Sequence, residues 1–500
     1  MGKKLIYLFL ILFLFGNRTV AQVVFNRNYD LDSISNTGIS VIQTLDGGYL
    51  VGGTNADFST GSSRAILLKT NSTGDTLWTK EWDFSSLGGD QIRSLIQLTD
   101  SSYIALGNTY DTIALNWDVI LLKLNPLGDT LWKKQYSIGT GIDLGYMVKQ
   151  AADGGFIIAG RTTSNTSGPE DAYWIKTDNS GNMQWQYQYG GANIDAVYSV
   201  DLCSDGGYIL GGQTKSYGAG LGDLFLIKIN SLGIFQWRKT FGTIENDYGE
   251  TVISTLDGGF IISGAIDDGT GFGSWNGYIV KTDNAGNMQW NKIFGYGTDN
   301  ESLNLVRQLQ DSTFVLAGST RLNSSVKFQG WLMKVNTMGD SLWSHTYGSS
   351  IPRDDYFYGL DLTNDGGFIL CGFYDTLFLP PYTNVWLVKT DCMGNDSAWD
   401  SASCSLTTSI PENVLENNFA IKVYPNPNNG QMTFEYELNG NAKGELSIYD
   451  VTGRKIANYD LSTGSKINTV SETSLNNGIY FYIYKINDVI KKSEKIVIIK

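Results

Sequence analysis

A sevenfold internal repeat constrains the fold more strongly than any other feature of the sequence. A turn aspartate returns at spacings of 52 to 54 residues, and five of the seven copies read Asp-Gly-Gly. Asp-Gly and Gly-Gly dipeptides supply the positive φ angles that a tight hairpin turn requires. Seven such turns at a regular spacing indicate stacked supersecondary units. The turn aspartates are Asp46, Asp100, Asp153, Asp205, Asp257, Asp311 and Asp365.

The second half of each unit is equally regular. An apolar run ends in a lysine, and a glycine-containing turn and a tryptophan follow, as in "AILLKTNSTGDTLW". Each unit therefore holds four short strands, and the third is apolar at consecutive positions, which predicts that both its faces are buried. Four-stranded units of about 50 residues that stack seven times fit a seven-bladed β-propeller, so we expect an all-β propeller over residues 22–405. The lysines are Lys69, Lys123, Lys176, Lys228, Lys281, Lys334 and Lys389.

The N-terminus carries a spare copy of the last strand of a unit. "VVFNRNYD" at 23–30 resembles "LWTKEWD" at 77–83, with Phe25 in the tryptophan position. A ring that is closed by the N-terminal strand predicts that residues 23–30 complete the seventh blade and hide its edge. Cys203 and Cys371 are expected to be buried free thiols. Whether Cys392 and Cys404 form a disulfide at this seam is left open by the sequence.

The first 21 residues form a targeting segment. Lys3 and Lys4 precede an apolar run from Leu5 to Phe15, and Thr19-Val20-Ala21 supplies small residues for cleavage. This pattern is typical of a secretory signal peptide, with a retained anchor as the alternative. No other long apolar run occurs, so we expect a mature chain without a transmembrane segment.

The Gly-x-x-x-Trp turn, as in "TDNSGNMQW" at 177–185, resembles the tryptophan-docking repeats of quinoprotein-like propellers. Those relatives usually have eight blades, and the quinone enzymes among them use an adjacent cysteine pair that this sequence lacks. The resemblance therefore implies a fold and not a chemistry.

The repeat stops after Cys404. Residues 406–419 read as a polar linker, and alternating apolar residues in 420–500 predict a small immunoglobulin-like β-sandwich. This tail resembles the type A C-terminal sorting domain of Bacteroidetes type IX secretion cargo. The resemblance implies Sec export, contact with the secretion machinery, and delivery across the outer membrane, with the tail cleaved for release or for surface attachment. The matching residues are Tyr424, Pro425, Asn426, Pro427, Gly430, Asp450, Gly453, Arg454, Gly478, Tyr480 and Lys500.

Composition excludes several functions. The net charge of −14 argues against a nucleic-acid partner, because phosphate binding needs a basic surface. A single histidine, His345, argues against a His-based catalytic triad or a multi-His zinc site. Each turn aspartate is expected to hold its turn, and a pair with the lysine of the same blade is plausible, whereas a calcium site is the less favoured reading. No cofactor is expected.

A third series stands ten residues before each turn aspartate, where the first strand of each blade begins. Six carboxylates and one amide around a channel would hold a cation or repel anions, but a repeated acid at such a position more often caps loop amides. We therefore expect a structural role. The series is Asn36, Asp90, Asp143, Asp195, Asp247, Glu301 and Asp355.

Loops that differ between blades are the expected binding surface. Aromatic residues in the longest second-to-third-strand loops are suited to stacking on a sugar or to a protein contact. They are Tyr217, Phe272, Trp275, Phe378 and Tyr382. The sequence thus favours a secreted, noncatalytic binding or adhesion module for a glycan or a protein. The alternatives are an extracellular polysaccharide hydrolase or lyase, for which the acidic pairs Asp267-Asp268 and Asp354-Asp355 are candidates, and a purely structural surface protein.

Overall fold

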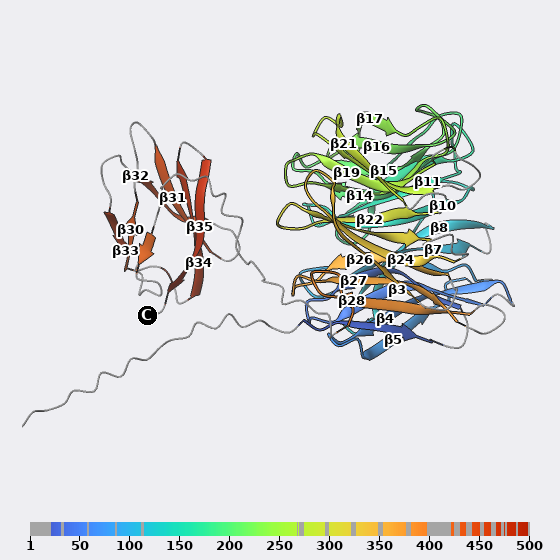
Figure 1. Cartoon of the computed structure of the whole chain (residues 1–500), viewed down its shortest axis with the longest axis horizontal. Helices are drawn as coiled ribbons and strands as arrows, with labels where there is room; N and C mark the ends of the chain where they lie inside the picture. Colours follow the sequence, from blue (N-terminus) through green and yellow to red (C-terminus); the bar gives the residue numbers. More distant parts are fainter. Residues whose placement is uncertain are drawn as a thin grey trace, which may run out of the picture. The chain divides into compact units, whose positions relative to one another are not determined.

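A computed structural model describes most of the repeat region and the strands of the tail (Figure 1). The chain divides into two compact units, Met1–Leu406 and Thr407–Lys500. The signal segment, the linker, Phe272 and Phe378 lie outside the described residues. The described residues are 22–31, 35–57, 60–85, 88–111, 115–267, 269, 275–295, 300–321, 327–348, 354–376, 382–397, 422–424, 431–436, 443–450, 455–461, 467–471, 475, 478–486 and 489–498.

The first unit contains seven four-stranded antiparallel sheets, the blades of a β-propeller. In the first six blades the strands follow one another in chain order, from an inner first strand to an outer fourth strand. Their bounds are β2 (Ser35–Gln43), β3 (Tyr49–Asp57), β4 (Ser62–Thr70), β5 (Thr76–Trp82); β6 (Gln91–Gln97), β7 (Tyr103–Asp111), β8 (Asn116–Leu124), β9 (Thr130–Tyr136); β10 (Asp143–Gln150), β11 (Phe156–Thr162), β12 (Asp171–Thr177), β13 (Met183–Tyr189); β14 (Asp195–Leu202), β15 (Tyr208–Thr214), β16 (Asp223–Ile229), β17 (Phe235–Phe241); β18 (Tyr248–Ser254), β19 (Phe260–Asp267), β20 (Trp275–Thr282), β21 (Met288–Phe294); β22 (Ser302–Gln308), β23 (Phe314–Thr320), β24 (Gln329–Val335) and β25 (Ser341–Tyr347).

Apolar contacts between neighbouring blades form the core. Ile66, Leu67 and Leu68 of β4 are all buried, which confirms that the third strand has two covered faces. Leu67 packs with Ile92 of the second blade, whereas Ile66 and Leu68 belong to the cluster shared with the seventh blade. Side chains alternate between the two faces of a strand, so a strand covered on both sides must be apolar at every position.

The seventh sheet has the strand order β1-β28-β27-β26, so that its outer strand comes from the start of the chain. Phe25 pairs with Lys389 and Tyr29 with Val385. The first strands of successive blades contact one another in turn, and β26 contacts β2. Figure 1 shows the blue strands of the first blade beside the orange strands of the last. The remaining bounds are β1 (Phe25–Tyr29), β26 (Asp355–Leu362), β27 (Phe368–Asp375) and β28 (Thr383–Thr390).

Strand β1 carries the same inter-blade contacts as the outer strands of other blades. A Cβ on Gly74 of the first blade would lie 2.9 Å from the Phe25 ring, as one on Gly128 would lie 2.8 Å from the Trp78 ring. Arg27 Nη1 lies 2.6 Å from Asp75 Oδ1, and the Tyr29 hydroxyl donates to the Gly74 carbonyl at 2.5 Å. Phe25, Arg27 and Tyr29 of this five-residue strand therefore all lie against the first blade.

The cysteines divide into bonded and free residues. Cys392 is disulfide-bonded, and Cys404, the partner that the sequence suggests, lies outside the described residues. Cys203 and Cys371 are free, as expected; Cys371 is buried and Cys203 is partly buried. Burial raises the pKa of the Cys203 thiol to about 11, so this thiol is unreactive at neutral pH.

The second unit consists of two antiparallel sheets, β29-β30-β33 and β32-β31-β34-β35. Met432 and Phe434 from the smaller sheet share one buried cluster with Leu446, Tyr482 and other residues of the larger sheet. An immunoglobulin-like topology stays a prediction. The strands are β29 (Lys422–Tyr424), β30 (Gln431–Glu435), β31 (Gly444–Asp450), β32 (Lys455–Leu461), β33 (Ile467–Ser471), β34 (Gly478–Ile486) and β35 (Val489–Ile498).

Four of the sorting-motif residues lie on these strands. Tyr424 ends β29 and pairs with Thr433, and Asp450 at the end of β31 pairs with Tyr480 of β34. Gly478 begins β34. The other members, Pro425, Asn426, Pro427, Gly430, Gly453, Arg454 and Lys500, lie outside the described residues.

Candidate ligand-binding cavity

A cavity of about 410 Å³ lies in the channel between the first strands of the blades. Strands β2, β6, β10, β22 and β26 line it, together with Leu45, Leu98 and Thr99 from the turns that follow two of these strands. The cavity therefore opens at the end of the channel where the first and second strands of each blade are joined. The longest variable loops join second to third strands and lie at the opposite end.

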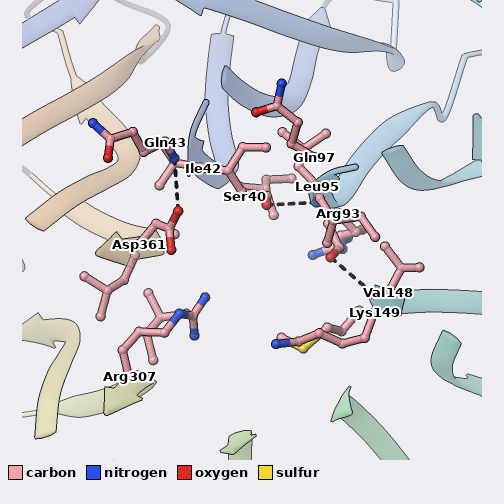
Figure 2. A pocket seen from close by; sticks show the side chains of 18 of the residues that line it. Ser40, Ile42, Gln43, Arg93, Leu95, Gln97, Val148, Lys149, Arg307 and Asp361 are labelled. Carbon is pink, nitrogen blue, oxygen red and sulfur yellow. Dashed lines mark hydrogen bonds between the residues drawn. The ribbon is translucent and has the colours of Figure 1, made fainter. Parts of the chain in front are cut away.

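Charged side chains from four blades reach into this cavity (Figure 2). Arg93, Lys149, Arg307 and Asp361 line it. Asp361 Oδ2 accepts a hydrogen bond from the Gln43 amide at 3.0 Å. Burial raises the pKa of Asp361, and the positive charge of Arg307 opposes that shift. The carboxylate is thus tied to the neighbouring blade.

The three cations are held in different ways. Lys149 Nζ lies 3.2 Å from Asp201 Oδ1, whose other oxygen accepts the Ser254 amide at 2.9 Å. Arg307 donates to the Val306 carbonyl at 2.9 Å. The Arg93 guanidinium lies 5.5 Å from the centre of the Tyr146 ring, and burial lowers the pKa of Arg93. These contacts fix the positive groups without neutralising all of them.

A β-bulge in the first strand of every blade creates a second feature of the channel. The register of the first and second strands shifts at the same place in all seven blades, and the extra residue stands seven positions before the turn aspartate. A bulge leaves a residue unpaired and redirects its side chain. In the sixth blade the register shift spans residues 303–304. In the other blades a single residue forms the bulge: Ile39, Arg93, Tyr146, Tyr198, Glu250 and Tyr358.

Bulge residues of neighbouring blades contact one another. The rings of Tyr146 and Tyr198 lie 5.0 Å apart, edge to face. Burial raises the pKa of Glu250 to about 7, and the positive charge of Arg93 opposes the rise. Glu250 as a whole residue is partly exposed, but protein encloses its carboxyl group, so that desolvation is the largest cause of the raised pKa.

The acidic series at the start of the first strands is buried throughout. Asp143 Oδ2 accepts the Ile138 amide at 2.7 Å, and Asp195 Oδ2 accepts the Gly191 amide at 2.7 Å. Asp90 receives two amides of its loop, Asp247 receives amides from two loops, Asp355 receives the Asp375 amide, and Glu301 accepts the Thr320 hydroxyl. Asn36 is fully buried. The six acidic side chains thus bond to nearby loops or strands of the propeller.

Each turn aspartate pairs with the lysine of its own blade, as the sequence suggests. The seven Nζ–Oδ distances run from 2.7 to 3.2 Å. The second glycine of the turn makes room for the ammonium group, since a Cβ on Gly48 would lie 2.6 Å from Lys69 Nζ. The two blades without that glycine have Ser102 and Thr313 in its place, and their lysines are 20% and 18% exposed instead of 5% or less.

The described loop aromatics pack onto the propeller. The Tyr217 hydroxyl donates to the Gly190 carbonyl at 2.9 Å, and the Arg238 guanidinium lies 3.9 Å from its ring centre. Trp275 meets Tyr248 edge to face at 5.0 Å. The Tyr382 carbonyl accepts the Thr376 amide at 2.9 Å, and its side chain is partly buried. The structure does not gather these three aromatics around the cavity.

The acidic pairs suggested for catalysis also serve local structure where they are described. Asp354 bonds Lys327 at 3.1 Å and the Phe328 amide at 3.0 Å, whereas Asp355 is buried. Asp267 Oδ1 accepts the Gly269 amide, and Asp268 lies outside the described residues. Within the described part of the chain, no group of three His, Cys, Asp or Glu side chains is placed to hold a metal ion.

Comparison with known proteins identifies the tail. Residues 422–500 match the family model described as the secretion system C-terminal sorting domain. The search of curated proteins found no match. Among the described residues, no helix has the length and apolar character to cross a membrane. The tail implies engagement with the type IX secretion machinery and export of the propeller to the cell surface or the extracellular space.

Three solved structures illustrate the similarity of this chain to other proteins. One is the extracellular domain of a B. thetaiotaomicron protein described as a one-component system, at 12% identity and TM-score 0.39, covering 94% of this chain and 58% of that one. Another is a fungal alcohol oxidase of the AA5 family in complex with copper, at 11% identity and TM-score 0.44, covering 96% and 100%. The third is the β-propeller domain of the trilobed protease from Pyrococcus furiosus, at 8% identity and TM-score 0.41, covering 74% and 100%. The chain thus spans 58% of the length of the first of these relatives, and none of the three similarities bears on function.

Proposed function

We propose that the propeller is a noncatalytic binding module and that its ligand enters the cavity at the end of the channel. The observation that carries this proposal is the cavity itself. Its volume of about 410 Å³ falls within the range of small-molecule sites, and a few charged groups stand among apolar walls such as Ile39, Ile42 and Leu95.

The chemistry of the lining residues favours binding over catalysis. The hydroxyls of Ser40 and Ser94 accept the amides of Leu95 and Val148, at 3.1 and 3.2 Å, and no described histidine lines the cavity to activate either. Asp361 is the one carboxylate among the described lining residues, whereas glycoside hydrolysis commonly uses two.

The proposal predicts which end of the channel binds the ligand. The full mature chain would be screened against neutral and acidic saccharides and against peptides, as the wild type and as two variants. Ile42→Trp fills the cavity and should abolish binding, whereas Trp275→Ala alters the opposite end and should leave binding intact. The reverse result, with binding lost only in Trp275→Ala, would place the site on the variable loops and refute the proposal. Turnover of a saccharide would favour the hydrolase or lyase.

We also propose that residues 1–21 direct Sec export, that residues 420–500 then act as the sorting signal, and that β1 closes the propeller ring. The family match at 422–500 and the pairing of β1 with β28 support these steps. Deletion of 420–500 should trap the protein in the periplasm. Surface delivery of the truncated chain would contradict the sorting role.

A further inference from the structure

The cavity has a different charge balance from the rest of the chain. The protein as a whole has a net charge of −14, but Arg93, Lys149 and Arg307 line the cavity against Asp361 alone. Low-dielectric walls focus the field of such a group of charges and raise the local concentration of the oppositely charged ion.

Two of the carboxylates near the cavity are already committed, and the third, Glu250 near Arg93, has a pKa raised to about 7. Asp361 accepts the Gln43 amide, and Asp201 accepts the Ser254 amide and pairs with Lys149. These bonds join neighbouring blades, so the two acids are held in place by the fold. A carboxylate that is fixed in this way neutralises only the cation that lies within reach of it.

The two guanidinium groups keep unused donors. The buried Arg93 Nε has no hydrogen-bond partner in the described part of the protein, and Arg93 contacts Tyr146 through its face. Arg307 gives one hydrogen bond, to the Val306 carbonyl. Among the residues that the structure describes, neither arginine forms an ion pair, although a guanidinium has five N–H donors.

We propose that the cavity binds a small organic anion whose carboxylate or sulfate group is held by Arg93 and Arg307, with Lys149 adding positive charge. This inference rests on the proposed function and names the class of its ligand. Guanidinium groups form paired, charge-assisted hydrogen bonds to such oxyanions. The apolar side chains of Ile42, Leu95 and Ile96 then cover the carbon skeleton, a feature that a bare inorganic ion would not use.

Calorimetric titration of the full mature chain tests the class of ligand. The probes are galacturonate, a sulfated galactose, a small dicarboxylate and inorganic phosphate, with galactose as the uncharged match. We expect an organic anion to bind at least tenfold more tightly than galactose and to weaken as salt is added. The saccharide and dicarboxylate arms distinguish an acidic sugar from a metabolite, and phosphate bound as tightly as the organic anions would overturn the role of the apolar walls.

Variants connect the binding to the two arginines. Arg307→Gln and Arg93→Gln should each weaken the anion at least tenfold, whereas Arg307→Lys keeps the charge and should weaken it less. Arg64→Gln is the matched control, because Arg64 is exposed and pairs with Glu81 on an outer strand. Tryptophan fluorescence verifies the fold of each variant, and any that is unfolded is replaced by Lys149→Gln, for which a smaller loss is expected.

The outcomes separate this inference from the proposed function. If galactose binds as well as galacturonate, and Ile42→Trp abolishes both, the cavity is a binding site but not an anion site. If no probe or screened ligand depends on Ile42, both proposals fail. If an anion binds equally well to the wild type and to the Arg93 and Arg307 variants, the assignment of these two arginines is wrong.

Discussion

The enclosed carboxyl of Glu250 makes the stability of the propeller depend on pH in a direction that can be measured. Its pKa of about 7 lies well above the ordinary value of 4.5. Since one pKa unit corresponds to about 1.4 kcal/mol, ionisation of Glu250 costs the folded state up to about 3.5 kcal/mol. The raised pKa fixes the sign: the contribution of this group is fully present below about pH 4.5 and is lost as the pH rises through 7.

The variant Glu250→Gln removes this ionisation and keeps the shape of the side chain. We expect the stability of the variant relative to the wild type, measured as the free energy of unfolding, to grow by about 2–3 kcal/mol between pH 5 and pH 8.5. Urea unfolding monitored by tryptophan fluorescence reports on the propeller alone, because all 13 tryptophans precede residue 406.

A matched control is Glu81→Gln, which removes a negative charge from an exposed position on the outer strand β5. The variant of Glu81 should not reproduce the pH-dependent gain. A difference between wild type and Glu250→Gln that is the same at pH 5 and pH 8.5 would refute the reasoning, because it would mean that Glu250 ionises as it does in water.

Three further predictions follow from the turns and the seam. Ser101 has a φ of 66°, so Ser101→Gly should relieve left-handed strain and raise the free energy of unfolding by about 0.5–1 kcal/mol after the entropy of the unfolded glycine is counted; a loss of stability in urea would contradict this. A hydrogen bond from Ser102 lowers the pKa of Asp100 to about 2. The wild type should therefore be more stable than Asp100→Asn above about pH 4, and the difference should fade as the pH falls toward 2. Acid titration of both proteins, followed by fluorescence, measures this difference, and a difference of the opposite sign would contradict the prediction. Phe25 is 8% exposed and packs against Gly74, so Phe25→Ala should lower the free energy of unfolding by about 3 kcal/mol and expose the seam to limited proteolysis. Phe25→Trp should largely keep the contact. Equal protease resistance of the wild type and Phe25→Ala would show that β1 does not hold the ring.

The repeated part of the fold was readable from the sequence because repetition makes a pattern independent of its surroundings. The turn aspartates, the lysines and the apolar third strands occur seven times, and each interacts with a neighbour in its own or the next blade. The match between Phe25 and the tryptophan position identified β1 as an outer strand for the same reason: its contacts to Gly74 copy those of Trp78 to Gly128.

The candidate site was not readable in this way, because it is built where the copies differ. The long loops and their aromatic residues predict binding at the variable end of the propeller. The cavity lies at the other end, beside short and nearly uniform turns. One signal was present in the sequence: seven positions before the turn aspartates, the copies read Ile, Arg, Tyr, Tyr, Glu, Asn and Tyr. Such variety inside a regular strand does not fit a buried repeat position.

A bulge at that position explains why the variety is tolerated. The bulge removes one residue of each first strand from the ladder and turns it toward the channel, so its side chain no longer has to fit the packing between blades. The scaffold can therefore remain constant while the channel changes from blade to blade, and charge can be placed there one residue at a time. In this chain the bulge positions hold Arg93 and Glu250, and other positions of the first strands hold Lys149, Arg307 and Asp361. The specificity of the propeller is thus expected to lie in single side chains of its most regular strands, and exchange of Arg93 or Arg307 should change the ligand without changing the fold.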